Sequence, residues 1–183
     1  MLEIPSGVIP AVRRMNDFEK ALKTTCNQIV LLETRLAMLK YLVTYAKREN
    51  KSVFIHFDLI QGLKADSYGM EYVIREVKPD GILSTRGNII TLAKKYDVLA
   101  IQRMFLLDSA ALDQNLKLVE RFKPDCVEVL PGLMPSIIDR VHQTTNIPVI
   151  AGGLITSQED VRSALDSGAI AVSTSNVDLW NVD

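Results

Sequence analysis

The chain has 183 residues, of which 48% are apolar, so it is long enough for one domain with a substantial core. Its 21 Lys and Arg residues against 22 Asp and Glu residues create no global positive field, so any RNA binding must use a local patch. No apolar run approaches membrane-spanning length and the N-terminus lacks a signal-peptide layout, so we expect a cytoplasmic protein with no membrane partner.

Short β-rich segments alternate with segments of helical spacing along the chain. The expected strands are Val8–Arg13, Gln28–Glu33, Val53–Asp58, Gly81–Thr85, Val98–Met104, Cys126–Leu130, Pro148–Ala151 and Ala169–Ser173. The expected helices span 17–23, 36–49, 68–77, 89–96, 110–122, 135–145 and 157–168. Pro135 and Ser157 favour helix starts, and Gly168 favours a helix stop.

Two junctions are near copies of each other. Glu76–Ser84 and Arg121–Val129 both place Lys-Pro-Asp between the end of a helix and the start of a strand. Their separation matches two strand–helix units. Eight such units would use the whole chain, which predicts a single domain over residues 1–183.

Alternating strands and helices predict a parallel sheet, either closed or open. The G-x-G-x-x-G fingerprint of open nucleotide-binding sheets is absent. We therefore expect an α/β protein with a compact (β/α)8 TIM-barrel-like fold, whose ligand face lies at the carboxyl ends of the strands.

Polar residues collect where the expected strands end. They are Arg13, Glu33, His56 with Asp58, Thr85 with Arg86, Gln102 with Arg103, Glu128, Gly152 with Gly153, and 173–176. The spacing of His56 and Asp58 predicts that both lie on one face of their strand. Burying such groups without partners costs about 2–7 kcal/mol each, so pairing with one another or with a ligand is expected.

Each of these residues also has a purely structural interpretation. His56 could be a core histidine, Asp58 a loop cap, and Gly152-Gly153 a tight turn, while Arg103 could only form an ion pair with Glu128 across neighbouring strands. His142, within an amphipathic helix, is expected to face solvent.

The sequence lacks the residues that several kinds of site chemistry require. Cys26 and Cys126 have no metal-binding spacing and are expected to be reduced thiols, and the H-x-D pair has no third zinc ligand, so no metal is predicted. A magnesium ion held by Asp58, Glu33 or Glu128 stays an open alternative, although no residue pattern indicates one. No lysine ends a strand, which argues against a Schiff base. Acid–base chemistry by His56, Asp58 or Glu128 stays open.

The segments after the last two strands predict a phosphate site. Gly152 and Gly153 allow close backbone approach to an anion, and Ser173, Thr174 and Ser175 add hydroxyl donors. Ser175 or Asn176 would cap a short helix through 177–180, whose N-terminus favours a dianion. A barrel that binds a small phosphorylated compound follows from these residues.

Six segments together carry a family resemblance. His56–Leu63, Asp80–Ile90, Ala100–Ser109, Val127–Gly132, Ile147–Ile155 and Gly168–Trp180 resemble the glycerol uptake operon antiterminator regulatory proteins, the glycerol-3-phosphate-responsive antiterminators of bacteria. The resemblance runs from about Pro5 to Trp180. It implies a barrel, glycerol 3-phosphate as effector with no cofactor, and binding of the leader mRNA of a glycerol-catabolic operon to promote readthrough.

Two functions of different classes therefore stand. The first is a metabolite-sensing regulator with no catalytic residue, and the alternative is a barrel lyase or isomerase acting on a small sugar- or triose-phosphate. In both, the predicted ligand residues are Arg13, His56, Asp58, Gln102, Arg103, Glu128, Gly152, Gly153, Ser173, Thr174 and Ser175.

For the regulator, the RNA surface is not set by the sequence. Its candidates are helix-borne cations, namely Lys47, Arg48, Lys94 and Lys95, with Arg35 and Lys40 on the same helix as the first pair. The sequence leaves open whether the chain forms a homo-oligomer.

Overall fold

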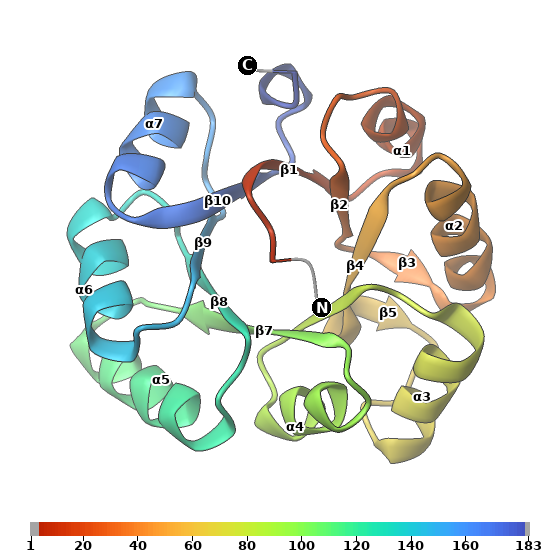
Figure 1. Cartoon of the computed structure of the whole chain (residues 1–183), viewed down its shortest axis with the longest axis horizontal. Helices are drawn as coiled ribbons and strands as arrows, with labels where there is room; N and C mark the ends of the chain where they lie inside the picture. The colour runs from red at the N-terminus through yellow and green to blue at the C-terminus, as the bar shows by residue number, and fades with distance from the viewer. Residues whose placement is uncertain (1–3, 182–183) are drawn as a thin grey trace.

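Eight parallel strands close into a barrel in the computed structural model, which describes residues 4–181 (Figure 1). Around the barrel the order is β1-β10-β9-β8-β7-β6-β4-β2. The strands are β1 (Gly7–Val12), β2 (Gln28–Leu31), β4 (Ser52–His56), β6 (Gly81–Ser84), β7 (Leu99–Phe105), β8 (Cys126–Leu130), β9 (Val149–Gly152) and β10 (Ala169–Thr174). The predicted (β/α)8 barrel is confirmed.

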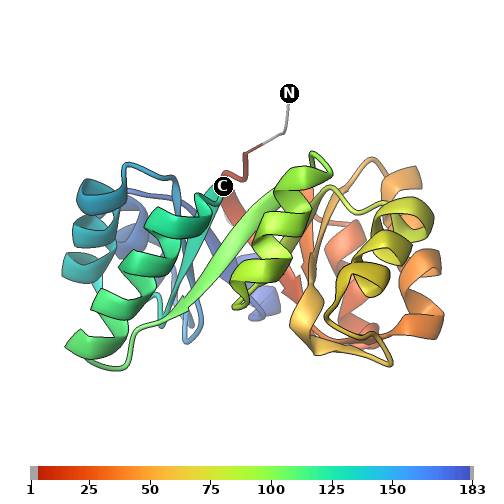
Figure 2. The ribbon, with the colours of Figure 1, turned by 90° about the horizontal axis from the view of Figure 1, so that it is seen from below.

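Within residues 4–181, seven α-helices cover the outside of the barrel and lie between consecutive strands (Figures 1 and 2). They are α1 (Met15–Leu22), α2 (Leu36–Arg48), α3 (Ser67–Tyr72), α4 (Gly87–Lys95), α5 (Ser109–Phe122), α6 (Pro135–Thr145) and α7 (Gln158–Asp166). None of the helices within residues 4–181 is long and apolar enough to cross a membrane.

Short elements depart from the expected pattern. The third helix ends in a π-helix, η2 (Val73–Val77), and a two-stranded sheet joins β3 (Thr34–Arg35) to β5 (Ile60–Gln61). In place of an eighth α-helix the chain forms a 3-10 turn, η3 (Val177–Leu179). Its N-cap is Asn176, one of the two residues predicted for that position.

The end of β4 corrects one prediction. The strand stops at His56, and Asp58 lies in a separate 3-10 turn, η1 (Phe57–Leu59), so the two residues do not share a strand face. The turn nevertheless brings the Asp58 carboxylate back to 3.7 Å from His56 Nε2.

Helix ends follow the sequence signals. Pro135 is the first residue of α6, and Ser157 is the N-cap of α7, in a capping box in which Asp160 accepts backbone N–H groups in return. Gly168 follows α7 at φ +96°. His142, by contrast, is half-buried rather than solvent-facing, and its buried Nδ1 has no hydrogen-bond partner within the described chain.

The two Lys-Pro-Asp junctions build the same clamp at the amino ends of the strands. Lys78 and Lys123 both end their helices in the left-handed conformation, at φ +57° and +48°. Each following aspartate accepts a backbone N–H from the preceding strand: Asp80 from Val53 at 2.8 Å and Asp125 from Ala100 at 2.9 Å.

The other carboxylate oxygen of each aspartate binds a lysine from the helix one strand–helix unit earlier, α2 for Asp80 and α4 for Asp125. Lys47 Nζ lies 2.9 Å from Asp80 Oδ1, and Lys94 Nζ lies 2.6 Å from Asp125 Oδ1. Two of the predicted RNA-binding lysines therefore already hold structural ion pairs.

The aspartate and the lysine of each junction should contribute unequally to the free energy of unfolding. Asp125→Ala leaves the Ala100 N–H without its acceptor, so we expect the free energy of unfolding to fall by about 1–3 kcal/mol. Lys94→Met removes only a partly exposed ion pair and should cost less than about 1 kcal/mol. Urea unfolding of both variants, with the exposed Asp113→Ala as control, measures this. Equal losses for Asp125→Ala and Lys94→Met would contradict the assignment.

Candidate functional site

Four polar residues point into the barrel near the carboxyl ends of its strands. The interior core is apolar and includes Phe54, Ile101, Cys126 and Ala171. Because side chains alternate along a strand, residues two positions further on face the same interior. Those residues are His56, Arg103, Glu128 and Ser173, all buried.

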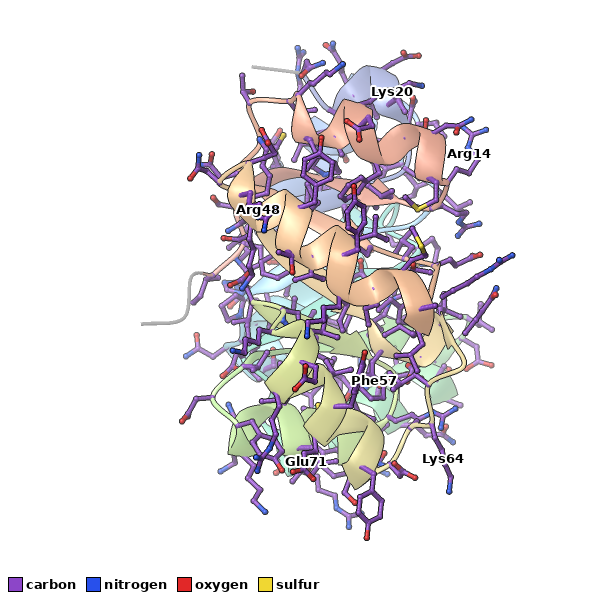
Figure 3. The ribbon with its side chains drawn as sticks, turned by 90° about the vertical axis from the view of Figure 1, so that its right-hand side faces the viewer. Arg14, Lys20, Arg48, Phe57, Lys64 and Glu71 are labelled. Atoms are coloured by element: carbon purple, nitrogen blue, oxygen red, sulfur yellow. The ribbon has the colours of Figure 1, made fainter. Side chains whose placement is uncertain are left out.

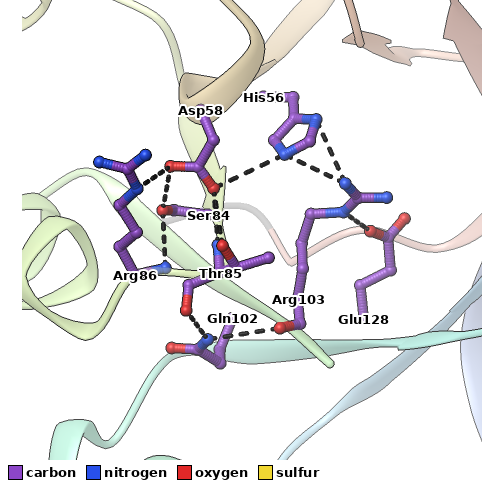
Figure 4. Close-up of polar contacts among 8 residues, drawn as sticks. All are labelled: His56, Asp58, Ser84, Thr85, Arg86, Gln102, Arg103 and Glu128. Carbon is purple, nitrogen blue, oxygen red and sulfur yellow. Dashed lines mark hydrogen bonds and ion pairs between the residues drawn. The ribbon is translucent and has the colours of Figure 1, made fainter. Parts of the chain in front are cut away.

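These four side chains form a continuous polar chain across the barrel. Figure 4 shows three of them, His56, Arg103 and Glu128. Arg103 Nη1 lies 3.0 Å from His56 Nε2, and Arg103 Nε donates to Glu128 Oε2 at 2.5 Å. Ser173 Oγ donates to the second oxygen of Glu128 at 2.7 Å. The ring of Phe105 lies 5.2 Å from the Arg103 guanidinium carbon. The predicted ion pair between Arg103 and Glu128 is thus present, but within a larger network.

A second cluster surrounds Asp58 at the same end of the barrel. Its carboxylate accepts hydrogen bonds from Ser84 Oγ at 2.8 Å and from the Thr85 backbone N–H at 2.8 Å, and it lies 3.6 Å from Arg86 Nε. Burial would raise the pKa of Asp58, but His56, the Thr85 N–H and Ser84 together outweigh it and lower this pKa to about 2. Asp58 therefore stays ionised at neutral pH.

Three contacts of Asp58, namely Ser84, Thr85 and Arg86, are not among the ligand residues predicted from the sequence. Thr85 and Arg86 were visible as polar strand-end residues, but Ser84 gave no signal, since a serine at the end of a buried strand is ordinary. The partners of Asp58 became evident only from the closure of β4 against β6, which pairs His56 with Leu83.

Gln102 lies on the other side of the sheet. It alternates with the interior residues Ile101 and Arg103, and its side-chain amide donates to the Thr85 carbonyl at 3.0 Å. Its Oε1 is buried and has no hydrogen-bond partner in the described residues. Strand alternation turns Gln102 toward the helices and away from the four interior residues, and its role as a ligand residue stays a prediction.

Gly152 and Gly153 have different roles. A Cβ on Gly152 would lie 2.6 Å from both Glu128 Oε1 and Ser173 Oγ, so the missing side chain makes room for the interior network. Gly153 has φ +76°, and the exposed Leu154 that follows also has a positive φ, of 61°. A bulky residue in this conformation is uncommon, and such backbone strain concentrates at functional sites.

The segments after β9 and β10, which the sequence predicts to hold a phosphate, lie side by side. Thr174 Oγ1 donates to the Ile155 carbonyl at 3.0 Å, and Asn176 Nδ2 donates to the Thr156 carbonyl at 3.0 Å. The Ser173 and Thr174 hydroxyls thus both donate within the fold, whereas Ser175 is exposed.

Arg13 lies beside these segments. β1 pairs with β10 so that Pro10 is opposite Thr174, which carries Arg13 past the end of the neighbouring strand. Its side chain is 62% exposed, and its Nε is 3.6 Å from Glu33 Oε1, a loose and solvated ion pair. Arg13 is therefore an accessible cation at this end of the barrel.

Metal binding has no counterpart in the described part of the chain, where no three His, Cys, Asp or Glu side chains gather suitably. Both cysteines are free thiols. Cys126 lies in the barrel interior, where burial and then the nearby Asp125 charge raise its pKa to about 12, so it is not a ready nucleophile.

Comparison with known proteins gives a consistent family. A family model described as "Glycerol-3-phosphate responsive antiterminator" matches residues 8–180. A solved glycerol uptake operon antiterminator regulatory protein from Listeria monocytogenes is 47% identical, with a TM-score of 0.93, covering 95% of this chain and 94% of that one.

Two further relatives cover nearly the whole chain. A glycerol uptake operon antiterminator-related protein from Thermotoga maritima is 30% identical, with a TM-score of 0.85, over 96% of this chain and 98% of that chain. The uncharacterized protein YgcP of Escherichia coli is 32% identical over 96% of this chain and 92% of its own.

The lowered pKa of Asp58 predicts a pH-dependent contribution to stability. Because the folded pKa, about 2, lies below the ordinary value of 3.8, this contribution is complete above about pH 4 and is lost as the pH falls toward 2. Asp58→Asn should therefore lower the free energy of unfolding by roughly 2 kcal/mol at pH 6, and its difference from the unmodified protein should shrink between pH 4 and pH 2. Denaturant titrations across pH, with Asp113→Asn as control, measure it; a difference independent of pH would contradict it.

The interior ion pair predicts strong coupling between its partners. Glu128→Gln leaves the Arg103 charge buried without its carboxylate, which should destabilise the fold by about 3–5 kcal/mol. Adding Arg103→Met should recover part of that loss, because the unpaired charge is then gone. A double-mutant cycle by urea unfolding tests this, and additive effects of the two substitutions would contradict it.

Proposed function

Because the chain belongs to the glycerol-3-phosphate responsive antiterminator family, we propose that it is a regulator that senses glycerol 3-phosphate. The liganded protein binds the leader mRNA of a glycerol-catabolic operon and promotes readthrough of its terminator. It works in the cytoplasm, where both the metabolite and the nascent transcript are found.

The observation that carries this proposal is the accessible cation beside two interlocked segments at the carboxyl end of the barrel. The exposed Arg13 guanidinium supplies charge where β1 runs past the end of β10, and the left-handed Gly153 leaves room for close backbone approach. The phosphate lies between the segments after β9 and β10, with Arg13 as its counter-charge. Backbone N–H groups and the Ser175 hydroxyl do the binding there, since Ser173 and Thr174 already donate elsewhere.

The glycerol hydroxyls lie over the interior polar chain. His56 and Arg103 offer hydrogen-bonding groups, and Asp58 offers a charged acceptor whose low pKa keeps it ionised at neutral pH, so it carries no proton to donate. Such groups recognise a polyol by position and charge without moving protons. Binding rather than catalysis is therefore the role we assign to them.

The enzyme alternative lacks a group that barrel lyases use. Lys51 is the buried lysine of the described chain, and it donates to the carbonyls of Thr24 and Cys26 at 2.7 Å each. It precedes β4 and so lies at the amino ends of the strands, away from the interior polar chain. Within residues 4–181, no buried lysine lies at the carboxyl end of the barrel to form a Schiff base.

Ligand binding should raise the melting temperature. At a hundred times Kd, a ligand that binds only the folded state adds about 2.7 kcal/mol, or roughly 5–10 °C for a chain of this size. Glycerol 3-phosphate should produce this shift, and glycerol at equal concentration should not. Gly153→Glu, which puts a carboxylate where the dianion lies, should abolish the shift.

Gly168→Glu is the matched control, since Gly168 also has a positive φ but lies away from the site. It should lower the melting temperature by strain and still respond to glycerol 3-phosphate. A full ligand-induced shift in Gly153→Glu would place the phosphate elsewhere.

The regulatory activity itself is tested by leader-RNA binding with and without glycerol 3-phosphate, beside a turnover assay. We expect tighter RNA binding with the ligand and an unchanged ligand after prolonged incubation. His56→Ala should weaken the response to ligand. Product formed by the unmodified protein but not by His56→Ala would favour the enzyme instead.

A further inference from the structure

The charges of this nearly neutral chain are unevenly distributed. Residues 1–100 contain fifteen Lys and Arg against eleven Asp and Glu, a net charge of +4, whereas residues 101–183 contain six against eleven, a net charge of −5. In the barrel these two parts become opposite sides, with α1 to α3 on the right of Figure 1 and α5 to α7 on the left. A polyanion is therefore attracted to one side only.

A groove on the positive side concentrates these charges. It lies between α2 and η2 and has a volume of about 590 Å³. Five cations and one acid contribute to its lining: Lys40, Lys47, Arg48, Arg75, Lys78 and Glu76. Figure 3 faces this side, with Arg48 at the end of α2 and Glu71 on α3.

Three of the five cations have carboxylate partners. Lys40 pairs with Glu76 at 2.7 Å, Lys47 with Asp80 at 2.9 Å, and Arg75 with Glu71 at 2.9 Å. Arg48 and Lys78 are exposed and have no ion pair within residues 4–181. Five cations against these three acids leave an excess of two positive charges, carried by Arg48 and Lys78.

Exposed tyrosines lie beside the same cations. Tyr41 on α2 is 61% exposed and lines a neighbouring depression together with Lys40 and Arg48. On the other side of the groove, Tyr72 is 37% exposed and close to Lys40, whose pKa is raised mainly by Glu76 and in smaller part by Tyr72. Exposed aromatic rings among cations are the arrangement on which unstacked bases of single-stranded RNA stack.

The other predicted basic pair is a weaker candidate. Lys94 is held by Asp125 at 2.6 Å, which leaves Lys95 as the cation of α4 without an ion pair in the described chain. Helix α2, in addition, contains no acidic residue over its thirteen positions. Of the helices proposed from sequence, α2 therefore fits a polyanion better.

We propose that single-stranded RNA binds along α2, with phosphates at Arg48 and Lys78 and a base stacked on Tyr41. This inference rests on the proposed function, because it assigns the surface by which the regulator holds its transcript. The complementary surface of a second copy, whose α5 to α7 side is acidic, is the competing occupant.

The test compares paired variants on the two sides of the barrel. The groove variant is Arg48→Gln with Lys78→Gln, and the matched control is Lys117→Gln with Arg140→Gln on α5 and α6. Fluorescence anisotropy with a labelled 20-nucleotide poly(U) and with a glycerol-operon leader transcript measures binding over a range of salt concentrations.

The slope of log K against log salt is negative, and each single-strand phosphate contact contributes about 0.7 to its magnitude. We expect this magnitude to decrease by about 1.4 in the groove variant, which loses two contacts, and to be unchanged in the control. Tyr41→Leu should weaken binding about tenfold at an unchanged slope. Circular dichroism should show all variants folded, because the substituted side chains are exposed.

The other outcomes separate the two proposals. If the unmodified protein binds RNA and the groove variant keeps its slope, the surface assignment fails and the regulator stands. If the unmodified protein binds neither RNA, with or without glycerol 3-phosphate, the proposed function fails and the surface with it. If the groove variant dissociates an oligomer in sedimentation experiments yet keeps its RNA affinity, α2 is an interface between copies and the proposal is overturned.

Discussion

The carboxyl end of this barrel depends on a guanidinium placed inside it. Arg103 lies among side chains that are almost wholly buried, and its charge is balanced by Glu128 at 2.5 Å. A buried pair of this kind seldom adds net stability over apolar packing, but removing one partner is costly. The pair therefore keeps His56 and Ser173 in place through its remaining hydrogen-bonding positions, and the interior becomes polar only in this layer.

The fold was largely predictable, because strand, helix and junction signals repeat along the chain and agree with one another. Cys126–Leu130 and the helix over 135–145 have the expected bounds, and the Lys-Pro-Asp junctions occupy equivalent places. The site was less predictable. Sequence spacing brought His56, Arg103 and Glu128 to one end, but it could not tell that Gln102 faces the helices or that Asp58 returns through a 3-10 turn. Those details depend on where each strand stops and on which residues the closed barrel pairs.

The same limit applies to the surface cations. Lys47 and Arg48 are adjacent and chemically alike in the sequence, yet only Lys47 is bound to the aspartate of a junction. Helix α2 begins beside the loose Arg13–Glu33 pair and ends at Arg48, because it runs back from the carboxyl ends of the strands to their amino ends. The proposed ligand and RNA surfaces thus lie toward opposite ends of one helix, so communication between them has to act along α2 or through the strands beneath it.

Gly152 has a consequence for how this protein can change over time. A methyl group there would overlap both the Glu128 carboxylate and the Ser173 hydroxyl, so three positions on three adjacent strands share one small volume. None of them can be enlarged while the other two stay as they are. An alanine at position 152 would require a shorter side chain at position 128. Arg103 would then lose its contact with the Glu128 carboxylate. The three positions of the polar layer are therefore coupled, and a larger side chain at 128, 152 or 173 has to be accommodated by changes at the other two.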